Sequence, residues 1–370
     1  MGSVWRFIVS RFVSKDQSAE SSSLSSKDYT ESAKNYAGFF ENKDGSEDMN
    51  AKNRQKDSNT VAKHYYDLAT DFYEYGWGDC FHFAPRYLGE SLEASLVRHE
   101  FFLASKIGIN KGHQVLDAGC GIMGPARNIS RFSGANVCGL NLNAYQVRRS
   151  NRLNARTNIN SRLSCVEGNF AKTEFANNSF DHIYSIEAFC HAPDRLEVYQ
   201  EMYRLLKPGG RLGIYDWVMT DKYDENDPEQ LHFKHFIEKG NGIANMLTAT
   251  ELTDTLKKTG FTILECTDLA EDEICRELGN DVTWFEPFLG KYRCSQQIML
   301  TPTGRWITQK VLEVLDFARI APKGTANMHH ILTQTAAALS RAGHLGIFTP
   351  MLFILVEKPA AAAAGAAAVS

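Results

Sequence analysis

A glycine-rich turn holds the residues whose types and spacing point most directly to chemistry. Val115 to Arg127 reads VLDAGCGIMGPAR, a short apolar run that leads through three glycines into a helical pattern. Glycines let the backbone approach a ligand closely, and a helix N-terminus offers free N–H groups. Gly119, Gly121 and Gly124 satisfy the spacing G-x-G-x-x-G, which suits a dinucleotide as well as S-adenosylmethionine. The segment therefore predicts a site for a nucleotide-like cofactor, the alternative being a turn without a ligand.

The residues around this turn distinguish between the two cofactors. A dinucleotide site normally carries an acidic residue about 20 positions further on, at the end of the second strand. That position reads GLNLN, with Asn141 and Asn143 and no carboxylate. Asp117, two residues before the first glycine, suits a cofactor with an ammonium and a sulfonium better than one with a pyrophosphate. We therefore predict S-adenosylmethionine, with Asn141 or Asn143 hydrogen-bonded to a ribose hydroxyl.

The adenine end of the predicted site follows a later strand. Methyltransferases often place an acid there, against the adenine amino group, but this chain has Asn169 in the run VEGNF. The side-chain oxygen of Asn169 can accept the same hydrogen bond. The complete set of predicted cofactor-binding residues is Asp117, Gly119, Cys120, Gly121, Asn141, Asn143, Gln146, Asn169, Phe170 and Glu187.

An aromatic segment precedes the glycine-rich turn. Tyr65 to Pro85 reads YYDLATDFYEYGWGDCFHFAP, in which nine residues are aromatic when His82 is counted. Gly76 and Gly78 interrupt the cluster and favour a loop over a regular element. The alternative is an amphipathic helix followed by a packed loop. Because N-terminal segments of such enzymes commonly fold over the active site, we predict that this one binds the acceptor substrate.

The elements that position these residues alternate between strands and helices. Helical periodicity separates the strands, as at 195–206, so we expect parallel strands with crossover helices in a doubly wound α/β sheet of seven strands. Two helical stretches, 303–319 and 325–341, break the alternation and predict a C-terminal insertion that caps the substrate cavity. The expected strands are 115–118, 135–140, 163–167, 180–186, 211–215, 261–266 and 351–356.

Composition divides the chain into four regions. Residues 1–60 are rich in Ser, Lys, Asp and Glu and are expected to form a flexible leader. Residues 61–270 are expected to form the cofactor-binding core with the aromatic segment, and residues 271–358 the capping region. The Ala-rich tail, 359–370, is expected to be disordered. The first fourteen residues, MGSVWRFIVSRFVS, are a candidate for contact with a membrane surface.

Four segments together resemble the sterol 24-C-methyltransferase family. They read YEYGWGDCFHFAPR, LDAGCGIMGPAR, IEAFCHAPD and YDWVMTDKYDENDPE, and the similarity runs from about Tyr65 to Pro359. The second segment is typical of any class I methyltransferase, whereas the other three are specific to the family. The chain departs from the family pattern at Asp79-Cys80, at Ile122-Met123 and at Asp216, where a Glu is common.

The resemblance implies methyl transfer from S-adenosylmethionine to C24 of a Δ24 sterol side chain. Attack by C24 would place positive charge on C25, and a hydride shift and proton loss would then give a 24-alkylidene sterol. Such a site needs cation-tolerant walls and no competing water. Aromatic faces stabilise a desolvated cation by roughly 2 kcal/mol or more each. The residues predicted to contact the substrate are Glu74, Tyr75, Trp77, Phe81, Phe83 and Trp217.

Proton loss requires a base. Glu187 and His191 follow the fourth strand and Asp216 ends the fifth, at the edge where open α/β sheets bind ligands. His191 is equally compatible with a structural role, and Glu74 is expected either to bind the sterol 3-hydroxyl or to orient a tyrosine. The predicted catalytic residues are Tyr75, Trp77, Glu187, His191, Asp216 and His82.

The overall composition limits the partners. The chain has 370 residues with a net charge of −4 and a pI of about 6.3, so nothing indicates nucleic acid as a partner. Its eight cysteines form no C-x-x-C pair, which predicts reduced thiols and no metal site. No apolar stretch reaches the roughly 20 residues of a spanning helix. The sterol substrate that the resemblance implies leads us to expect a peripheral enzyme of the endoplasmic reticulum or lipid droplets, with homo-oligomer formation left open.

Other functions remain as alternatives at this point. A methyltransferase for another lipid acceptor would share the glycine-rich half of the chain but lack the aromatic Gly-Trp-Gly segment. A non-catalytic sterol-binding relative is favoured by the departures Met123, Asn169 and Asp216. A nicotinamide oxidoreductase is disfavoured by the missing acid after the second strand.

Overall fold

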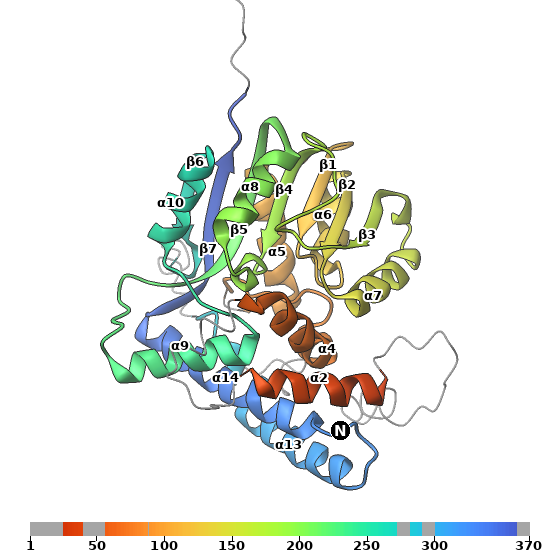
Figure 1. Ribbon diagram of the computed structural model, residues 1–370, viewed down its shortest axis with the longest axis vertical. Coiled ribbons are helices and arrows are strands. Elements are labelled where there is room, and N and C mark those ends of the chain that lie inside the picture. Colours follow the sequence, from red (N-terminus) through yellow and green to blue (C-terminus); the bar gives the residue numbers. More distant parts are fainter. Residues whose placement is uncertain (1–24, 40–55, 88, 272–281, 291–299, 361–370) are drawn as a thin grey trace, which may run out of the picture.

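A mixed sheet lies at the centre of the molecule. The computed structural model describes residues 25–39, 56–87, 89–271, 282–290 and 300–360. In this part of the chain, seven strands form one sheet in the order β3-β2-β1-β4-β5-β7-β6 (Figure 1). The strands are β1 (Gln114–Ala118), β2 (Asn136–Asn141), β3 (Leu163–Glu167), β4 (Phe180–Ile186), β5 (Leu206–Met219), β6 (Thr262–Asp268) and β7 (Phe348–Glu357). The seven-stranded, doubly wound sheet predicted from the sequence is confirmed.

Strand direction follows the connections. β1 to β5 pair in parallel, whereas β7 runs antiparallel to both β5 and β6. β7 carries the run FTPMLFILV, in which every residue is buried. A continuous apolar run of this kind is typical of a strand covered on both faces. The last strand follows the capping region, as expected, and the structure places it between β5 and β6.

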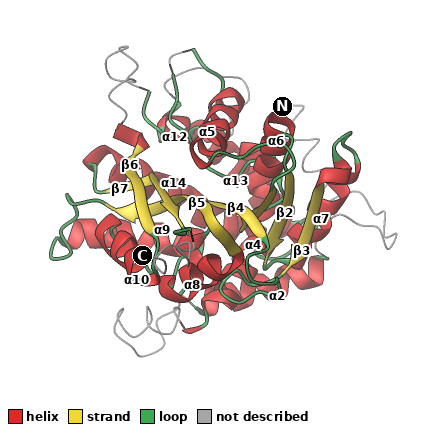
Figure 2. Ribbon diagram, turned by 90° about the horizontal axis from the view of Figure 1, so that it is seen from above, coloured by secondary structure: helices red, strands yellow, loops and turns green. Residues whose placement is uncertain are grey.

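Helices cover both faces of the sheet (Figure 2). α5 (Leu92–Ile107) and α6 (Gly124–Ser133) pack on one face, and α8 (Arg195–Leu205) and α10 (Ala249–Thr259) pack on the other. Side chains alternate between the two faces along a strand. Val115 accordingly joins the cluster under α5 and α6, and Leu116 joins the cluster under α8 and α10.

A helical layer lies below the sheet in Figure 1. It contains α2 (Ser26–Gly38), α4 (Ser58–Trp77), α9 (Pro228–Asn241), α13 (Pro302–Phe317) and α14 (Thr325–Leu345). α14 packs against α4, α9 and α13, so the C-terminal helices and the N-terminal aromatic helix meet in one layer. The two helices predicted in the capping region are confirmed. None of the described helices is long and apolar enough to span a membrane.

Two sequence expectations about the N-terminal part need correction. Within the predicted leader, residues 26–38 form α2, whose Tyr29 and Tyr36 are buried against Val61 and Tyr65 of α4. These tyrosines bury apolar surface in α2, although the leader as a whole has a mostly polar composition. The aromatic segment is helical through Trp77, and its loop begins only at Gly78, where φ is 79°. The helix-then-loop alternative is therefore the correct one, because Gly76 does not end the helix.

Some expectations fall on residues that the structure does not describe. The first fourteen residues and the Ala-rich tail after position 360 lie outside the described ranges. In the part of the chain that is described, six cysteines are free: Cys80, Cys120, Cys138, Cys165, Cys190 and Cys266.

Candidate active site

A first cavity, here called the cofactor cavity, lies where the parallel strands end. Its volume is about 900 Å³ including its open mouth, and residues of α4, from Asn59 to Tyr66, cover one side. β1 and β2 lead into its wall through the glycine-rich turn and Asn141, because parallel strands direct their carboxyl ends to one edge. All ten residues predicted from the sequence to bind the cofactor lie in this wall.

Gly119 shows why the turn requires glycine. Its φ is 91°, and a Cβ atom there would lie 2.2 Å from the Cβ of Ala188. Gly121 also has a positive φ, of 52°. No side chain fits between the turn and the segment after β4 at Gly119, so backbone forms this part of the cavity wall. The glycine-rich turn therefore also forms a wall of the cofactor cavity.

Asp117 contributes a carboxylate to the wall of the cofactor cavity. It is 2% exposed, and Tyr184 of the adjacent strand donates a hydrogen bond from Oη to its Oδ2 at 3.1 Å. Burial raises the pKa of Asp117 to about 7, although the bond from Tyr184 opposes the shift. A carboxylate held this far from water gains from a cationic partner. The residues present therefore fit the ammonium and sulfonium of S-adenosylmethionine.

The polar residues after β2 are held by a hydrogen-bond network. Asn141 donates from Nδ2 to Gln146 Oε1 at 2.7 Å and to the Gly121 carbonyl at 2.9 Å. Asn143 caps α7 (Ala144–Ala155) by accepting from Gln146 N, and donates from Nδ2 to Asp67 of α4. The side chain of Asn143 thus links α7 to α4, which covers one side of the cavity. Asn141 is hydrogen-bonded to the same degree, because its Oδ1 accepts from the Asn143 backbone N–H at 3.0 Å. It is the more accessible of the two for a ribose contact, at 8% exposed against 2% for Asn143.

A second cavity, here called the acceptor cavity, lies between the aromatic segment and the C-terminal helices. Its volume is about 1090 Å³ including its open mouth, against about 900 Å³ for the cofactor cavity. Four predicted aromatic residues line it, namely Trp77, Phe81, Phe83 and Trp217. They pack edge to face or tilted, with ring centroids 5.9 Å apart for Trp77 and Phe83 and 5.8 Å apart for Phe83 and Trp217.

The two cavities share a wall, which we call the junction. It consists of Tyr66, Phe81, His82, Glu187 and His191, which line both cavities. Any group transferred between molecules in the two cavities must pass this junction. Three of the residues predicted to be catalytic, His82, Glu187 and His191, therefore lie where two bound molecules would meet.

Glu187 is the buried acid of the junction. The backbone N–H of Phe83 donates to its Oε1 and the Trp217 indole donates to its Oε2, both at 2.7 Å. Burial raises the pKa of Glu187 to about 8, and these two donors limit the rise. Its φ of 52° is a left-handed conformation that few side chains other than Asn and Asp adopt. Such local strain often accompanies a functional position.

His191 is neutral in the junction. Its Nδ1 lies 3.2 Å from the Gly242 carbonyl and its Nε2 lies 2.9 Å from the Tyr66 hydroxyl. A carbonyl only accepts, so Nδ1 carries the hydrogen and Nε2 accepts from Tyr66. Burial lowers the pKa of His191 to about 4. Tyr66 was not predicted individually; its place in the aromatic segment is the sequence signal for it.

His82, part of the junction, forms a buried ion pair with Glu100. Its Nε2 lies 3.0 Å from Glu100 Oε1, and its Nδ1 lies 2.7 Å from the Phe83 carbonyl. Burial alone would lower the pKa of His82, but the hydrogen bond and charge of Glu100 outweigh it and raise the pKa. The Cys80 sulfur lies within 4.8 Å of a His82 ring nitrogen and of a Glu100 carboxylate oxygen. Asn128 donates hydrogen bonds to both Glu100 and Cys80. Both nitrogens of His82 are therefore occupied.

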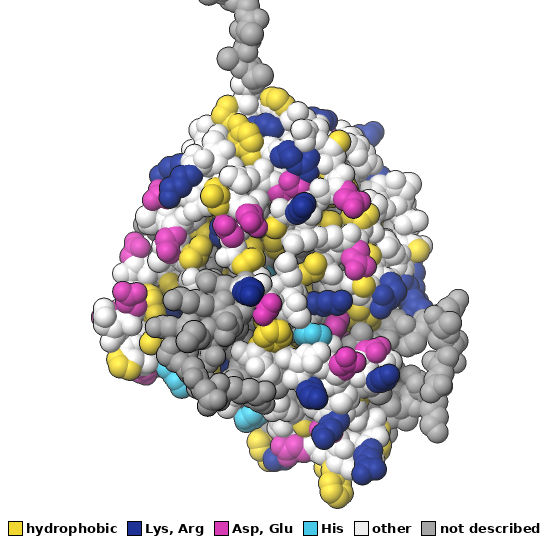
Figure 3. Space-filling model, in the orientation of Figure 1, with side chains coloured by type: hydrophobic (Ala, Val, Ile, Leu, Met, Phe, Trp, Pro, Cys, Tyr) yellow, Lys and Arg dark blue, Asp and Glu magenta, His cyan; other side chains and the backbone are white. Residues whose placement is uncertain are grey.

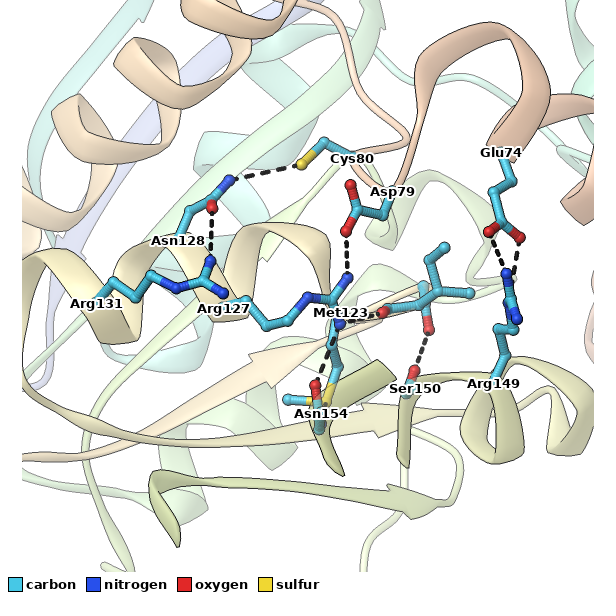
Figure 4. A network of polar contacts seen from close by, with 12 residues as sticks. Glu74, Asp79, Cys80, Met123, Arg127, Asn128, Arg131, Arg149, Ser150 and Asn154 are labelled. Carbon is cyan, nitrogen blue, oxygen red and sulfur yellow. Dashed lines mark hydrogen bonds and ion pairs between the residues drawn. The ribbon is translucent and has the colours of Figure 1, made fainter. Parts of the chain in front are cut away.

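Two predicted site residues are placed differently, and the prediction for a third is not tested. Asp216 lines neither cavity; it is fully buried on the opposite face of β5, where Oδ2 lies 3.6 Å from Arg195 Nη2. The prediction was wrong because β5 continues to Met219 and does not end at Tyr215. Glu74 forms an ion pair with Arg149 of α7 and lines neither cavity (Figure 4). The Tyr75 side chain lies outside what the structure describes.

Two departures from the family pattern have structural partners. Asp79 forms an ion pair with Arg127 of α6 at 2.6 Å (Figure 4). Met123 is fully buried directly before α6 and has a φ of 63°, a conformation that glycine adopts without strain. Asp79 thus pairs with α6 and Met123 precedes this helix, while Asp79 and Asn169 both line the cofactor cavity.

Comparison with known proteins decides the family. Residues 116–214 match a methyltransferase domain and residues 296–360 match a sterol methyltransferase C-terminal region. The chain is 41% identical to the sterol 24-C-methyltransferase of Kluyveromyces lactis, over 91% of this chain and 92% of that protein. It is 43% identical to the cycloartenol-C-24-methyltransferase of Arabidopsis thaliana, over 84% and 90% of the two chains.

The chain belongs to the sterol 24-C-methyltransferase family. It is therefore a class I methyltransferase that uses S-adenosylmethionine, as the glycine-rich turn and the missing acid after β2 predict. The nicotinamide oxidoreductase alternative is thereby excluded.

Solved structures share the fold at low identity. A cyclopropane synthase from Mycobacterium tuberculosis aligns with a TM-score of 0.62 and 16% identity, over 81% of this chain and 98% of that chain. A geranyl diphosphate C-methyltransferase from Streptomyces coelicolor aligns with a TM-score of 0.55 and 16% identity, over 83% and 98%. The architecture of this sterol 24-C-methyltransferase family member is thus that of class I methyltransferases.

Proposed function

We propose that the protein transfers a methyl group from S-adenosylmethionine to C24 of a Δ24 sterol in sterol biosynthesis. The observation that carries the proposal is the junction, where buried Glu187 lies between a cofactor cavity and a large aromatic cavity. S-adenosylmethionine supplies an electrophilic methyl group when bound. Asp117, Asn141 and the glycine turn would hold it, and Trp77, Phe83 and Trp217 would surround the apolar acceptor.

The aromatic residues would stabilise the charge that the acceptor develops. When C24 of the alkene takes the methyl group, C25 is left with a positive charge. Aromatic faces stabilise a desolvated cation by about 2 kcal/mol or more each. Trp77, Phe83 and Trp217 line the acceptor cavity and lie in one packed cluster. Packed rings also exclude water, which would otherwise capture the cation.

Proton removal completes the proposed reaction. A hydride shift from C24 to C25 moves the charge to C24, and loss of a proton from the new methyl group leaves a 24-methylene sterol. We assign the base to Glu187. Its pKa of about 8 suits proton transfer near neutral pH, and it lies in the junction itself.

The other candidate bases fit less well. The His82 nitrogens are both donors in hydrogen bonds, so no lone pair is available. His191 Nε2 accepts from Tyr66, and its pKa of about 4 makes it a weak base. Asp216 pairs with Arg195 outside both cavities. We therefore assign His191 and His82 to positioning Tyr66 and the Phe83 backbone, respectively.

A lipid surface is the expected source of the acceptor. α13 exposes Trp306 by 63%, Val314 by 66% and Phe317 by 92%. Figure 3 shows hydrophobic side chains protruding at the lower end of the molecule, where α13 lies in Figure 1. Lys, Arg, Asp and Glu are interspersed over the rest of that face (Figure 3). Exposed aromatic residues of this kind favour peripheral contact with a membrane interface, on the endoplasmic reticulum or a lipid droplet.

Product analysis tests the proposed function. The purified protein is incubated with methyl-labelled S-adenosylmethionine and a panel of sterols with and without a Δ24 double bond. We expect label only in the Δ24 sterols, with a 24-methylene product in the mass spectrum. Label in another lipid acceptor, or cofactor binding without any transfer, would contradict the proposal and favour one of the alternatives.

A further inference from the structure

The acceptor cavity differs chemically between its two ends. At the junction its wall is aromatic apart from Glu187 and the two histidines. At the other end, α13 and α14 contribute polar residues, and these two helices pack against each other in the helical layer below the sheet (Figure 1). None of these polar residues lines the cofactor cavity; they are Arg305, Thr308, His329 and Thr333.

Polar atoms at this remote end lack protein partners. Thr308 is only 7% exposed, and its hydroxyl has no hydrogen-bond partner in the described part of the chain. The same holds there for the Thr333 hydroxyl and for Nε of Arg305. Proteins satisfy nearly all buried polar groups. Three unsatisfied groups in one cavity wall therefore indicate a polar atom of a ligand.

Arg305 determines which end of an acceptor can lie here. Its Nη1 donates to the carbonyls of Phe288 and Leu300, so the guanidinium is fixed in the wall. A guanidinium stays charged, and a positive charge close to a developing carbocation raises its energy. The reacting carbon must therefore lie at the Glu187 end, and the opposite end of the molecule must lie near α13.

His329 adds to the polar end. Its Nδ1 lies 2.8 Å from Gln309 Oε1, and burial lowers its pKa to about 4. An amide oxygen only accepts, so Nδ1 carries the hydrogen and Nε2 keeps a lone pair. Threonine hydroxyls, a guanidinium N–H and an imidazole lone pair together match a group that both donates and accepts. A hydroxyl group is such a group.

We propose that Thr308 and Thr333 bind the ring hydroxyl of the sterol, opposite its reacting side chain. The proposal rests on the proposed function and specifies how the substrate is oriented. It also replaces Glu74 as the residue for the hydroxyl, since Glu74 is paired with Arg149 outside the cavity. Thr308 and Thr333 thereby select hydroxylated acceptors over apolar lipids of similar size.

Valine substitutions test the orientation. Thr308→Val and Thr333→Val keep the side-chain shape and remove the hydroxyl, and each variant is assayed with a Δ24 3-hydroxysterol and with its 3-deoxy analogue. We expect the unaltered enzyme to prefer the hydroxysterol at least about tenfold in kcat/KM. A double variant that carries both Thr308→Val and Thr333→Val should lose most of that preference, because its KM should rise for the hydroxysterol and not for the 3-deoxy analogue.

Thr335 of α14 supplies the matched control. It lines the same cavity, but its hydroxyl donates to the Ile331 carbonyl of its own helix at 2.9 Å. Thr335→Val should leave the preference unchanged, and unchanged affinity for S-adenosylmethionine should show that all variants are folded. A preference that persists in the double variant would overturn this inference. If the unaltered protein methylated no Δ24 sterol, the proposed function itself would fail.

Discussion

The indole nitrogen of Trp217, within β5, donates to Glu187, directly after β4, at 2.7 Å. The bond joins Trp217, which lines the acceptor cavity, to Glu187, which lines both cavities. It fixes the carboxylate at the junction and favours its charged form. The negative group and the aromatic face are thereby presented to the same acceptor carbon atoms.

Trp217→Phe tests the role of this bond. The variant keeps an aromatic face but removes the donor, so the pKa of Glu187 should rise further above about 8. If ionised Glu187 is the base, kcat increases as the pH rises through its pKa. The acidic limb of the kcat profile should therefore move to higher pH. Trp284→Phe, in the same aromatic cluster, should leave the limb in place; an unmoved limb in Trp217→Phe would remove Glu187 as the base.

Asp117→Asn tests the cofactor assignment. A carboxylate with a pKa of about 7 is fully ionised only above neutral pH. Its contribution to binding a cationic cofactor should therefore grow as the pH rises from 6 to 8. Calorimetry should show that the difference in affinity between the unaltered enzyme and Asp117→Asn widens over this range. Tyr184→Phe, which removes a bond that lowers the pKa of Asp117, should shift the rise to higher pH. Equal affinities throughout would contradict the assignment.

Trp77→Ala tests cation stabilisation. Loss of one aromatic face worth about 2 kcal/mol should lower kcat by about 30-fold. Trp77 lines only the acceptor cavity, so affinity for S-adenosylmethionine should not change. Trp77→Phe should retain most of the turnover. Steady-state kinetics together with cofactor binding measure both effects, and a parallel loss of the two would argue for a general structural role.

The exposed face of α13 predicts lipid contact. Replacing Trp306 and Phe317 by serine should reduce sedimentation of the protein with vesicles of phosphatidylcholine and an acidic phospholipid. Phe132 of α6 is also aromatic and 50% exposed, and Phe132→Ser should sediment like the unaltered protein. Equal sedimentation of all three proteins would place the lipid contact elsewhere.

Local patterns predicted much of the fold and of the cofactor cavity. The glycines directly follow β1 and Asn141 ends β2, and parallel strands bring their ends together, so the ten predicted residues lie in one cavity wall. The acceptor cavity is different. Thr308 and Thr333 come from two helices of the capping region, and no spacing rule joins them to Glu187.

The wrong placements have local physical causes. Asp216 was expected at a strand end, but β5 extends past it and turns its side chain toward Arg195. Glu74 lies within the aromatic segment, but the helical continuation of α4 turns it toward Arg149. In both cases the extent of an element decided the direction of the side chain, and element ends are poorly marked in a sequence.

A structure of the protein with S-adenosylhomocysteine and a Δ24 sterol tests the central claim most directly. We predict the nucleoside against Gly119 and Asp117, and C24 of the sterol beside Glu187, about 3–3.5 Å from where the donor methyl would lie. The ring hydroxyl should contact Thr308 and Thr333. A sterol side chain directed toward Arg305, or a sterol bound outside the aromatic cavity, would contradict the account.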